Sequence, residues 1–362
     1  MSQSKMIERK INARTGARAQ INRRRLLTVA GYAAGALVAP SVLFRARAAE
    51  LKPVTLTLDW IYQGPNAGFM VALDRGFYRE AGLDVAMTPG RGSASTAQLI
   101  ASKAAQFGFS DGYVLGNSVA RGMALKNIGG IYRRNPAGIM VLSDSDIKTP
   151  KDLEGKTVGL TAGSAQFQQW PAFCKGAGVD ASKVEVVNVD PAGVSAALIS
   201  GKVPAIGGFV QGYVPSIEIR GKKQARVFYF ADYGVTAVSN GIIVHDDLLK
   251  NDPELLRAFV TPTIKGFLYA RKNPDEGTAV VKKYLETVDL GITRREMELS
   301  WKNWVTPNTN GKPLGWGSDA DWAATVDVLR QYGGLTVPLD AATLYTNEFV
   351  PTGAEFVPPQ GI

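Results

Sequence analysis

The amino-acid sequence predicts an α/β fold built from two similar lobes, each a sheet flanked by helices. Its 362 residues are enough for two domains, and strand-like and helix-like segments alternate after residue 49. Residues 99–103 (LIASK) and 198–202 (LISGK) share their spacing, and each precedes a strand-like segment and a Gly-containing turn. A match this short can arise by chance, but its agreement with the repeated strand–loop–helix order favours two related lobes.

The first elements follow from periodicity. Residues 54–60 alternate apolar and polar side chains as a strand does, and residues 68–79 place apolar side chains on one helical face. A second strand is expected at 83–87. Capping-box spacing at 95–98 predicts a helix start there, and a short strand follows at 106–110.

The middle of the chain repeats this order. Residues 156–160 and 184–189 are predicted strands, and a small-residue break at 162–164 precedes a helix. Asp190 followed by Pro191 is a favourable helix start, and Gly201 ends that helix.

Two apolar, β-branched segments, 139–142 and 241–244, flank this middle section. We expect them to be two hinge strands that join the lobes. The predicted organisation is an export segment at 1–48, a first lobe at 49–137 plus 247–362, and a second lobe at 138–246.

The basic charge is confined to the first 48 residues. The whole chain carries a formal charge of +9, and residues 1–48 hold ten basic side chains and one acid, which leaves 31 of each sign afterwards. A neutral remainder lacks the electrostatic footprint of a nucleic-acid-binding protein. No nucleic-acid partner is therefore expected.

Residues 22–28 (NRRRLLT) resemble a twin-arginine export signal. An uncharged run at 26–44 and the cleavage box Ala46-Arg47-Ala48 follow. A membrane anchor is the alternative, but weak hydrophobicity and Pro40 argue against it. We expect a signal peptide cleaved near Ala48 and a periplasmic protein.

No catalytic constellation is recognisable. The chain has one Cys, Cys174, and one His, His245, so intramolecular disulfides, Cys-rich metal sites and two-imidazole schemes are excluded. Ser195 lies in a sequence that only partly matches a nucleophile elbow, inside a predicted helix. We expect no catalytic residue, metal or cofactor. An exported enzyme remains the alternative of another class.

A ligand is expected beyond the carboxyl ends of the strands, where helices begin with unpaired N–H groups. The loop 59–66 combines a carboxylate, an aromatic ring and amides that suit a flat heterocycle. Gly, Ser or Asp residues follow three further strands, at 90–95, 110–112 and 161–165. Phe209, Gln211 and Tyr213 occupy the equivalent position at the opening of the second lobe. The predicted ligand-binding residues are Asp59, Trp60, Gln63, Asn66, Gly92, Ser93, Ala94, Ser95, Ser110, Asp111, Gly163, Ser164, Ala165, Gln211, Tyr213 and Tyr233.

Several motifs keep the order seen in one family of exported proteins: 58–60 (LDW), 72–78 (ALDRGFY), 82–85 (GLDV), 152–156 (DLEGK), 232–235 (DYGV) and 345–351 (YTNEFVP). With them the mature chain resembles the periplasmic solute-binding proteins of ABC importers, in the branch that binds thiamine pyrimidine precursors and is related to sulfonate, taurine and nitrate binders. This resemblance implies a type II periplasmic binding protein fold that closes on a small solute. It also implies a monomer that hands the solute to permease and ATPase subunits. Tyr233 enters the expected site on this ground.

The chain departs from that branch at three points. Asn66 stands where pyrimidine-type members commonly have His, and residues 207–213 contain no acid where precursor binders tend to carry Glu. The Cys-rich motif of the pyrimidine-synthesising relatives is missing, which disfavours an enzyme of that kind. Gln211 or Asp111 could replace the missing acid. The expected solute is pyrimidine-like or another flat heteroaromatic compound, and a sulfonate, nitrate or aromatic carboxylate is the alternative.

Overall fold

The computed structural model describes residues 50–359, and residues 1–49 and 360–362 lie outside it. The predicted export segment at 1–48 therefore falls outside the described residues. Among residues 50–359, no helix has the length and hydropathy that crossing a bilayer requires.

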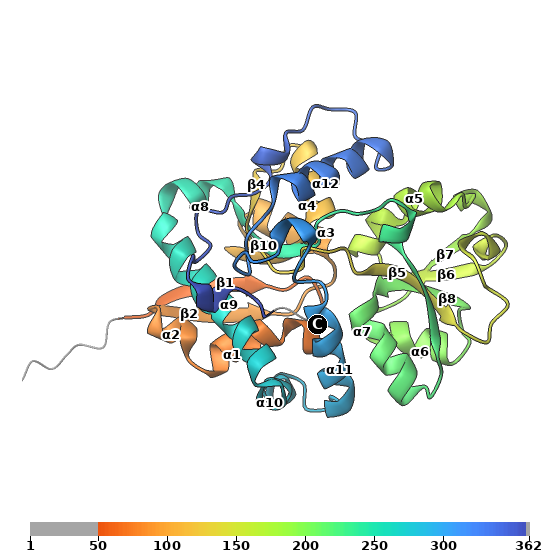
Figure 1. Cartoon of the computed structure of the whole chain (residues 1–362), viewed down its shortest axis with the longest axis horizontal. Helices are drawn as coiled ribbons and strands as arrows, with labels where there is room; N and C mark the ends of the chain where they lie inside the picture. Colours follow the sequence, from red (N-terminus) through yellow and green to blue (C-terminus); the bar gives the residue numbers. More distant parts are fainter. Residues whose placement is uncertain (1–49, 360–362) are drawn as a thin grey trace, which may run out of the picture. The chain divides into compact units, whose positions relative to one another are not determined.

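The first lobe is built on a five-stranded sheet with the order β2-β1-β3-β10-β4 (Figure 1). β10 runs antiparallel to both of its neighbours, whereas β1 pairs in parallel with β2 and β3. The strands are β1 (Lys52–Thr57), β2 (Leu83–Thr88), β3 (Phe107–Asp111), β4 (Leu125–Gly130) and β10 (Asn240–His245). The strands expected at 54–60, 83–87 and 106–110 match β1, β2 and β3 to within a few residues.

The second lobe has a sheet of the same design, with the order β7-β6-β8-β5-β9. β5 is antiparallel to β8 and β9, and β6 is parallel to β7 and β8. The strands are β5 (Ala137–Leu142), β6 (Thr157–Leu160), β7 (Glu185–Asn188), β8 (Ala205–Phe209) and β9 (Ala225–Tyr229). The prediction of two sheets flanked by helices is thus confirmed.

The short sequence repeat marks equivalent places in the two lobes. Residues 99–103 lead from α3 (Ser93–Ala101) into β3, and residues 198–202 lead from α6 (Val194–Ile199) into β8. β3 and β8 are the central strands of their sheets. The repeat therefore reflects the same helix-to-central-strand turn.

The strand pairing corrects the position of the crossings between lobes. The two segments expected to be hinge strands are β5 and β10, and each is paired on both edges inside a sheet. The chain crosses instead at 131–136 and in the stretch 230–239 that precedes β10. β10 consequently belongs to the first lobe, not to the second lobe as expected. An apolar β-branched run indicates a buried strand but not which sheet buries it.

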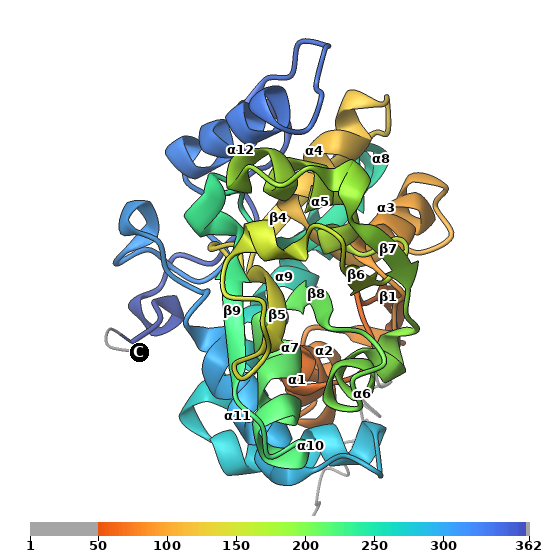
Figure 2. The same ribbon diagram turned by 90° about the vertical axis from the view of Figure 1, so that its right-hand side faces the viewer.

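Helices cover both faces of each sheet. In the first lobe, α1 and α9 lie on one face and α3 and α4 on the other, and Figure 2 shows α5 on one side of the second sheet with α6 and α7 opposite. The remaining helices are α1 (Ala67–Asp74), α2 (Phe77–Glu80), α4 (Gly112–Ala120), α5 (Ala165–Ala177), α7 (Val210–Pro215), α8 (Asp246–Asn251), α9 (Pro253–Lys272), α10 (Pro274–Tyr284), α11 (Leu290–Trp301) and α12 (Asp319–Gln331).

Two predicted helix boundaries are corrected by backbone geometry. The helix expected at 68–79 is divided into α1 and α2 by Gly76, whose φ of 77° lies in the left-handed region. The capping box expected at 95–98 is absent: α3 begins at Ser93 with Gly92 as its N-cap. The Ser93 hydroxyl instead accepts a hydrogen bond from the Asp111 backbone N–H at 3.2 Å. This contact ties the start of α3 to the end of β3.

Candidate ligand-binding site between the lobes

A cavity between the two lobes is lined mainly by the segments that follow β1, β2, β6 and β8. The free space among its lining atoms, about 440 Å³, includes space that is open to solvent. Only about 20 Å³ of this can hold the centre of a water molecule, so the lobes are closely apposed around it. The lining residues are Asp59, Trp60, Gln63, Pro65, Asn66, Gly92, Ser93, Tyr132, Ser164, Ala165, Gln166, Phe209, Gln211 and Tyr213.

The site lies where sheet topology predicts it. β1 ends just before Asp59, β6 just before the 161–166 turn, and β8 at Phe209. The carboxyl ends of these parallel strands point toward the other lobe, so their loops meet in the cleft. Helices α3 and α5 also begin at this edge, with Gly92 and Ser164 as their N-caps.

The lobes touch directly beside the cavity through two glycine loops. The backbone N–H of Ala94 in the first lobe donates to the carbonyl oxygen of Gly163 in the second at 3.1 Å. A Cβ atom at Gly92 would lie 2.2 Å from that same oxygen, and Gly92 has a φ of 137°. The contact therefore requires glycine at position 92. The structure represents the lobes in a closed arrangement.

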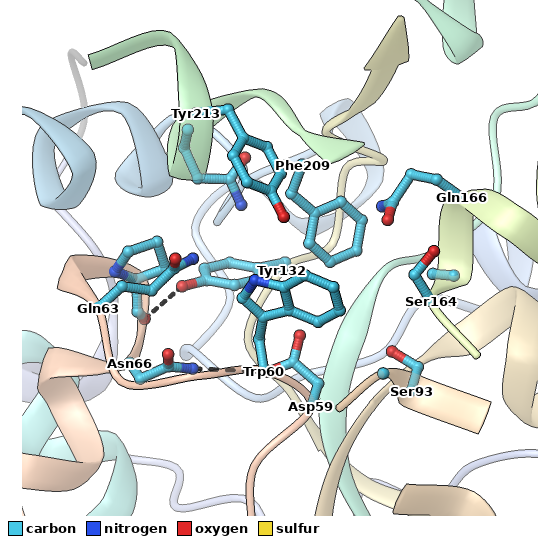
Figure 3. A pocket seen from close by; sticks show the side chains of 14 residues that line it. Asp59, Trp60, Gln63, Asn66, Ser93, Tyr132, Ser164, Gln166, Phe209 and Tyr213 are labelled. Atoms are coloured by element: carbon cyan, nitrogen blue, oxygen red, sulfur yellow. Dashed lines mark hydrogen bonds between the residues drawn. The ribbon is translucent and has the colours of Figure 1, made fainter. Parts of the chain in front are cut away.

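Aromatic rings from both lobes surround the cavity. Trp60 extends from the first lobe, and Phe209 and Tyr213 extend from the second lobe, as Figure 3 shows. Tyr132, from the first crossing segment, lies behind Trp60, and its hydroxyl donates to the Pro65 carbonyl oxygen. This set of rings suits a flat ligand that stacks between the lobes.

Asp59 is the only Asp, Glu, Lys, Arg or His among the lining residues. Its Oδ2 accepts a hydrogen bond from Asn240 Nδ2 at 2.7 Å, and its Oδ1 accepts one from Asn66 Nδ2 at 3.5 Å. Burial raises the pKa of this carboxyl from 3.8 to about 7, against the lowering effect of these donors. The two amides hold Asp59 at the floor of the site.

Four buried polar atoms of the lining side chains have no hydrogen-bond partner among the described residues. Trp60 Nε1 and Asn66 Oδ1 come from the first lobe, and Gln166 Nε2 and Gln211 Oε1 come from the second. Leaving such groups buried and unpaired is costly. Each lobe therefore offers one donor and one acceptor to whatever fills the cavity.

Ten of the sixteen predicted residues line this cavity, and six do not. Gly163, Ala94 and Ser95 lie at the contact between the glycine loops. Ser110 and Asp111 are fully buried behind it, where the Ser110 hydroxyl donates to the Ser93 carbonyl oxygen.

Asp111 has a structural role at the lobe interface. Its Oδ1 caps α4 by accepting from the backbone N–H groups of Tyr113 and Val114, and it also accepts from Gln169 Nε2 of the second lobe at 3.1 Å. Burial raises its pKa to about 6. Asp111 therefore joins the lobes without lining the cavity.

Tyr233 lies away from the cavity. Its ring packs edge-on against Phe173 of α5, with ring centroids 5.5 Å apart. The segment that carries it leads into the second crossing rather than to the cleft. Tyr233 was predicted from the 232–235 motif. That motif indicates a turn, but it does not indicate the direction in which the Tyr233 ring points.

The sequence analysis missed three residues of the site region. Gln166 follows the Ser164 cap by two residues, so the position of the α5 start could have indicated it. Tyr132 lies in a crossing segment with no periodic pattern. Glu296 of α11 holds the loop that carries the site residues 59–66: its Oε2 accepts a hydrogen bond from the Gly64 N–H at 2.9 Å. Burial raises the pKa of Glu296 to about 8.

Within residues 50–359, no group of three or more His, Cys, Asp or Glu side chains is placed to hold a metal ion. The sulfur of Cys174 is buried, and burial raises the pKa of its thiol to about 12.

The family is decided by a match to a family profile that covers most of the residues lining the cavity. The profile described as "NMT1/THI5 like" matches residues 64–277, more than half of the chain. The protein belongs to the NMT1/THI5-like family.

Two curated relatives of this NMT1/THI5-like protein are named as binding proteins. The riboflavin-binding protein RibY of Chloroflexus aurantiacus is 26% identical over 84% of this chain and 88% of its own length. The formylaminopyrimidine-binding protein of Halalkalibacterium halodurans is 25% identical over 82% and 90%. A more distant relative, from Legionella pneumophila, is named 4-amino-5-hydroxymethyl-2-methylpyrimidine phosphate synthase and is 23% identical over 62% of this chain and 71% of its own.

The fold of the NMT1/THI5-like protein is that of periplasmic binding proteins. The periplasmic aliphatic sulphonate binding protein SsuA of Escherichia coli superposes with a TM-score of 0.60 at 14% identity, covering 81% of this chain and 91% of that one. The similarity shows a shared architecture.

Proposed function

We propose that this protein is a solute receptor of an ABC importer that captures a flat heteroaromatic compound between its lobes. The observation that carries the proposal is the closed inter-lobe cavity, in which aromatic rings stand beside four unpartnered polar atoms. Rings of this kind bind the faces of a flat ligand, and the polar atoms bind its edges. Relatives named for riboflavin and formylaminopyrimidine binding support a ligand of this class.

A sulfonate or nitrate ligand is less well supported by the charges. No Lys, Arg or His lines the cavity, and the carboxylate of Asp59 does. An anion would have to rely on the starts of α3 and α5 while lying close to a group that ionises near neutral pH. A ligand that presents N–H donors to Asp59 avoids this repulsion between two negative charges.

We propose a binding role without catalysis. The described cavity has no general base paired with a nucleophile, and its single carboxylate is held by Asn66 and Asn240. The relative named as a synthase makes an enzyme the competing hypothesis. Product formation from any bound candidate would support that competing view.

We further propose that the twin-arginine-type segment at 1–48 exports the protein to the periplasm and is removed near Ala48. There the protein would act as a monomer that delivers its solute to permease and ATPase subunits in the inner membrane. The family relationship and the periplasmic binding protein fold support this assignment.

Thermal unfolding of residues 49–362 against a ligand panel tests the proposal. The panel holds aminopyrimidines, isoalloxazines, aromatic carboxylates, alkanesulfonates and nitrate. A ligand at 100 times its Kd stabilises the folded state by about 2.7 kcal/mol, which shifts Tm by several degrees. We expect a shift with a heteroaromatic compound and none with the anions. A shift with sulfonate or nitrate alone would overturn the heteroaromatic assignment.

A further inference from the structure

We propose that the ligand is a neutral, carbonyl-bearing heterocycle with an N–H group between or beside its carbonyls, as in a cyclic imide or ureide. An aminopyrimidine, a cation or an anion fits the cavity less well. This inference rests on the proposed receptor function and specifies which chemical class of ligand the same cavity recognises.

The unpartnered atoms belong only to uncharged side chains. Trp60 Nε1 and Gln166 Nε2 are donors, and Asn66 Oδ1 and Gln211 Oε1 are acceptors. Indole and amide groups pair with neutral ligand edges without charge assistance. A neutral ligand that both donates and accepts therefore leaves the fewest groups unpaired.

Asp59 is partly engaged within the protein, so fewer of its lone pairs are left for a ligand. Both of its oxygens accept hydrogen bonds from amide groups, Asn240 at one oxygen and Asn66 at the other. Its role is to orient Asn66, whose remaining oxygen has no partner. A charged amidine edge pairs best with a carboxylate that offers both oxygens, and Asp59, whose oxygens already bind Asn240 and Asn66, is the only Asp or Glu that lines the cavity.

Two serine hydroxyls add donors to the site. Ser164 Oγ accepts from the Phe167 N–H at 3.1 Å, and Ser93 Oγ accepts from the Asp111 N–H at 3.2 Å. Neither hydroxyl hydrogen has an acceptor among the contacts of the described residues, and both serines line the cavity. A hydroxyl that accepts from the backbone still has its own hydrogen to donate.

Among these six groups, four are donors and two are acceptors, and the Gln63 amide and the Tyr213 hydroxyl, which also line the cavity, can each donate and accept. The indole N–H, the Gln166 amide and the two serine hydroxyls call for acceptors on the ligand, whereas Asn66 and Gln211 offer places for its N–H groups. Ring carbonyls supply acceptors, and an imide or ureide N–H supplies the donor. An amino group would instead compete for the few acceptors that the cavity offers.

The test compares three neutral probes and two isosteric substitutions. Lumichrome carries an imide edge, and 4-amino-5-hydroxymethyl-2-methylpyrimidine carries an amino edge. Titration of the purified protein by calorimetry should give a Kd at least tenfold lower for lumichrome. N3-methyl-lumichrome, which lacks the imide N–H, should bind at least tenfold more weakly than lumichrome, since a site built to bond an N–H rejects an analogue without it.

Gln166→Glu replaces a donor by an acceptor of the same shape. We expect it to raise the Kd for lumichrome at least tenfold, whereas Gln211→Glu keeps an acceptor at its position and should raise it less. Ligand-free unfolding curves of both variants must match the parent's, and Gln166→Leu is the substitute if Gln166→Glu does not fold.

Three outcomes distinguish the two proposals. Tighter binding of the aminopyrimidine overturns the imide inference and leaves the receptor function standing. If N3-methylation of lumichrome or the Gln166→Glu substitution leaves the Kd unchanged, the inference is also overturned. Binding of neither probe, together with binding of an alkanesulfonate, overturns both.

Discussion

Trp60 is the ring on which stacking at the proposed site depends. It extends from the first lobe toward Phe209 and Tyr213. Stacking of a flat base on an aromatic side chain contributes about 1–3 kcal/mol. We therefore predict that Trp60→Ala raises the Kd of the heteroaromatic ligand about 5- to 150-fold in calorimetric titration.

Trp60→Phe is the matched control because it keeps a smaller aromatic ring and removes the indole N–H. Its Kd should lie between those of the parent and of Trp60→Ala. Equal Kd values for the parent and Trp60→Ala would show that the ligand does not stack there.

Asp59 makes the stability of the protein depend on pH. Its pKa is about 7 in the folded protein and 3.8 ordinarily, so the folded state binds more protons than the unfolded state between these values. The free energy of unfolding therefore falls as pH rises through this window. Buried Asp111 and Glu296, with pKa values of about 6 and 8, act in the same direction.

We predict that Asp59→Asn reduces the loss of stability between pH 4.5 and 7.5 by on the order of 1–4 kcal/mol. Urea unfolding at both pH values measures it. Asp84→Asn, at an exposed position of β2, should leave the pH dependence unchanged. An unchanged slope in Asp59→Asn would mean that Asp59 is ionised throughout this range.

Residue types and strand ends were enough to predict most of the cavity lining. Asp59, Trp60 and Gln211 could be found because polar or aromatic groups at the carboxyl end of a strand point into a cleft. Tyr132 could not, since its position depends on where the chain crosses between lobes. Tyr233 and Asp111 were misplaced because a local turn does not show which way its side chain faces.

At the scale of elements, the contact between the loops that begin α3 and α5 controls closure. A methyl group at Gly92 would overlap the Gly163 carbonyl oxygen. We predict that Gly92→Ala prevents full closure and weakens ligand binding at least tenfold, because apparent affinity falls with the population of the binding-competent state. Small-angle scattering should show less compaction with saturating ligand than in the parent.

Gly193→Ala is the matched control, because a Cβ atom at Gly193 meets nothing within 4 Å. Its affinity and compaction should equal the parent's. Parent-like compaction in Gly92→Ala would show that the glycine contact is not needed for closure.

At the scale of the whole molecule, the chain has to be exported before it can act as proposed. Replacing Arg23, Arg24 and Arg25 by Lys keeps the charge but removes every arginine pair in that segment. We predict that the unprocessed precursor then stays in the cytoplasm, as fractionation and immunoblotting would detect. Arg9→Lys, Arg14→Lys and Arg18→Lys together should export normally. Normal export of the first variant would exclude the twin-arginine route.

The alternation of strands and helices, the repeat at 99–103 and 198–202, and the neutral charge after residue 48 were determined by the sequence alone. These properties depend on local sequence or on composition, so they can be predicted without knowing which distant residues are in contact. Tertiary structure decided three others: that β10 returns to the first sheet, that Gly92 meets Gly163, and that Asn240 and Asn66 hold Asp59. Apart from the bond between Asn66 and Asp59, each joins groups distant in the chain, and such contacts depend on how the elements are packed, which periodicity does not specify.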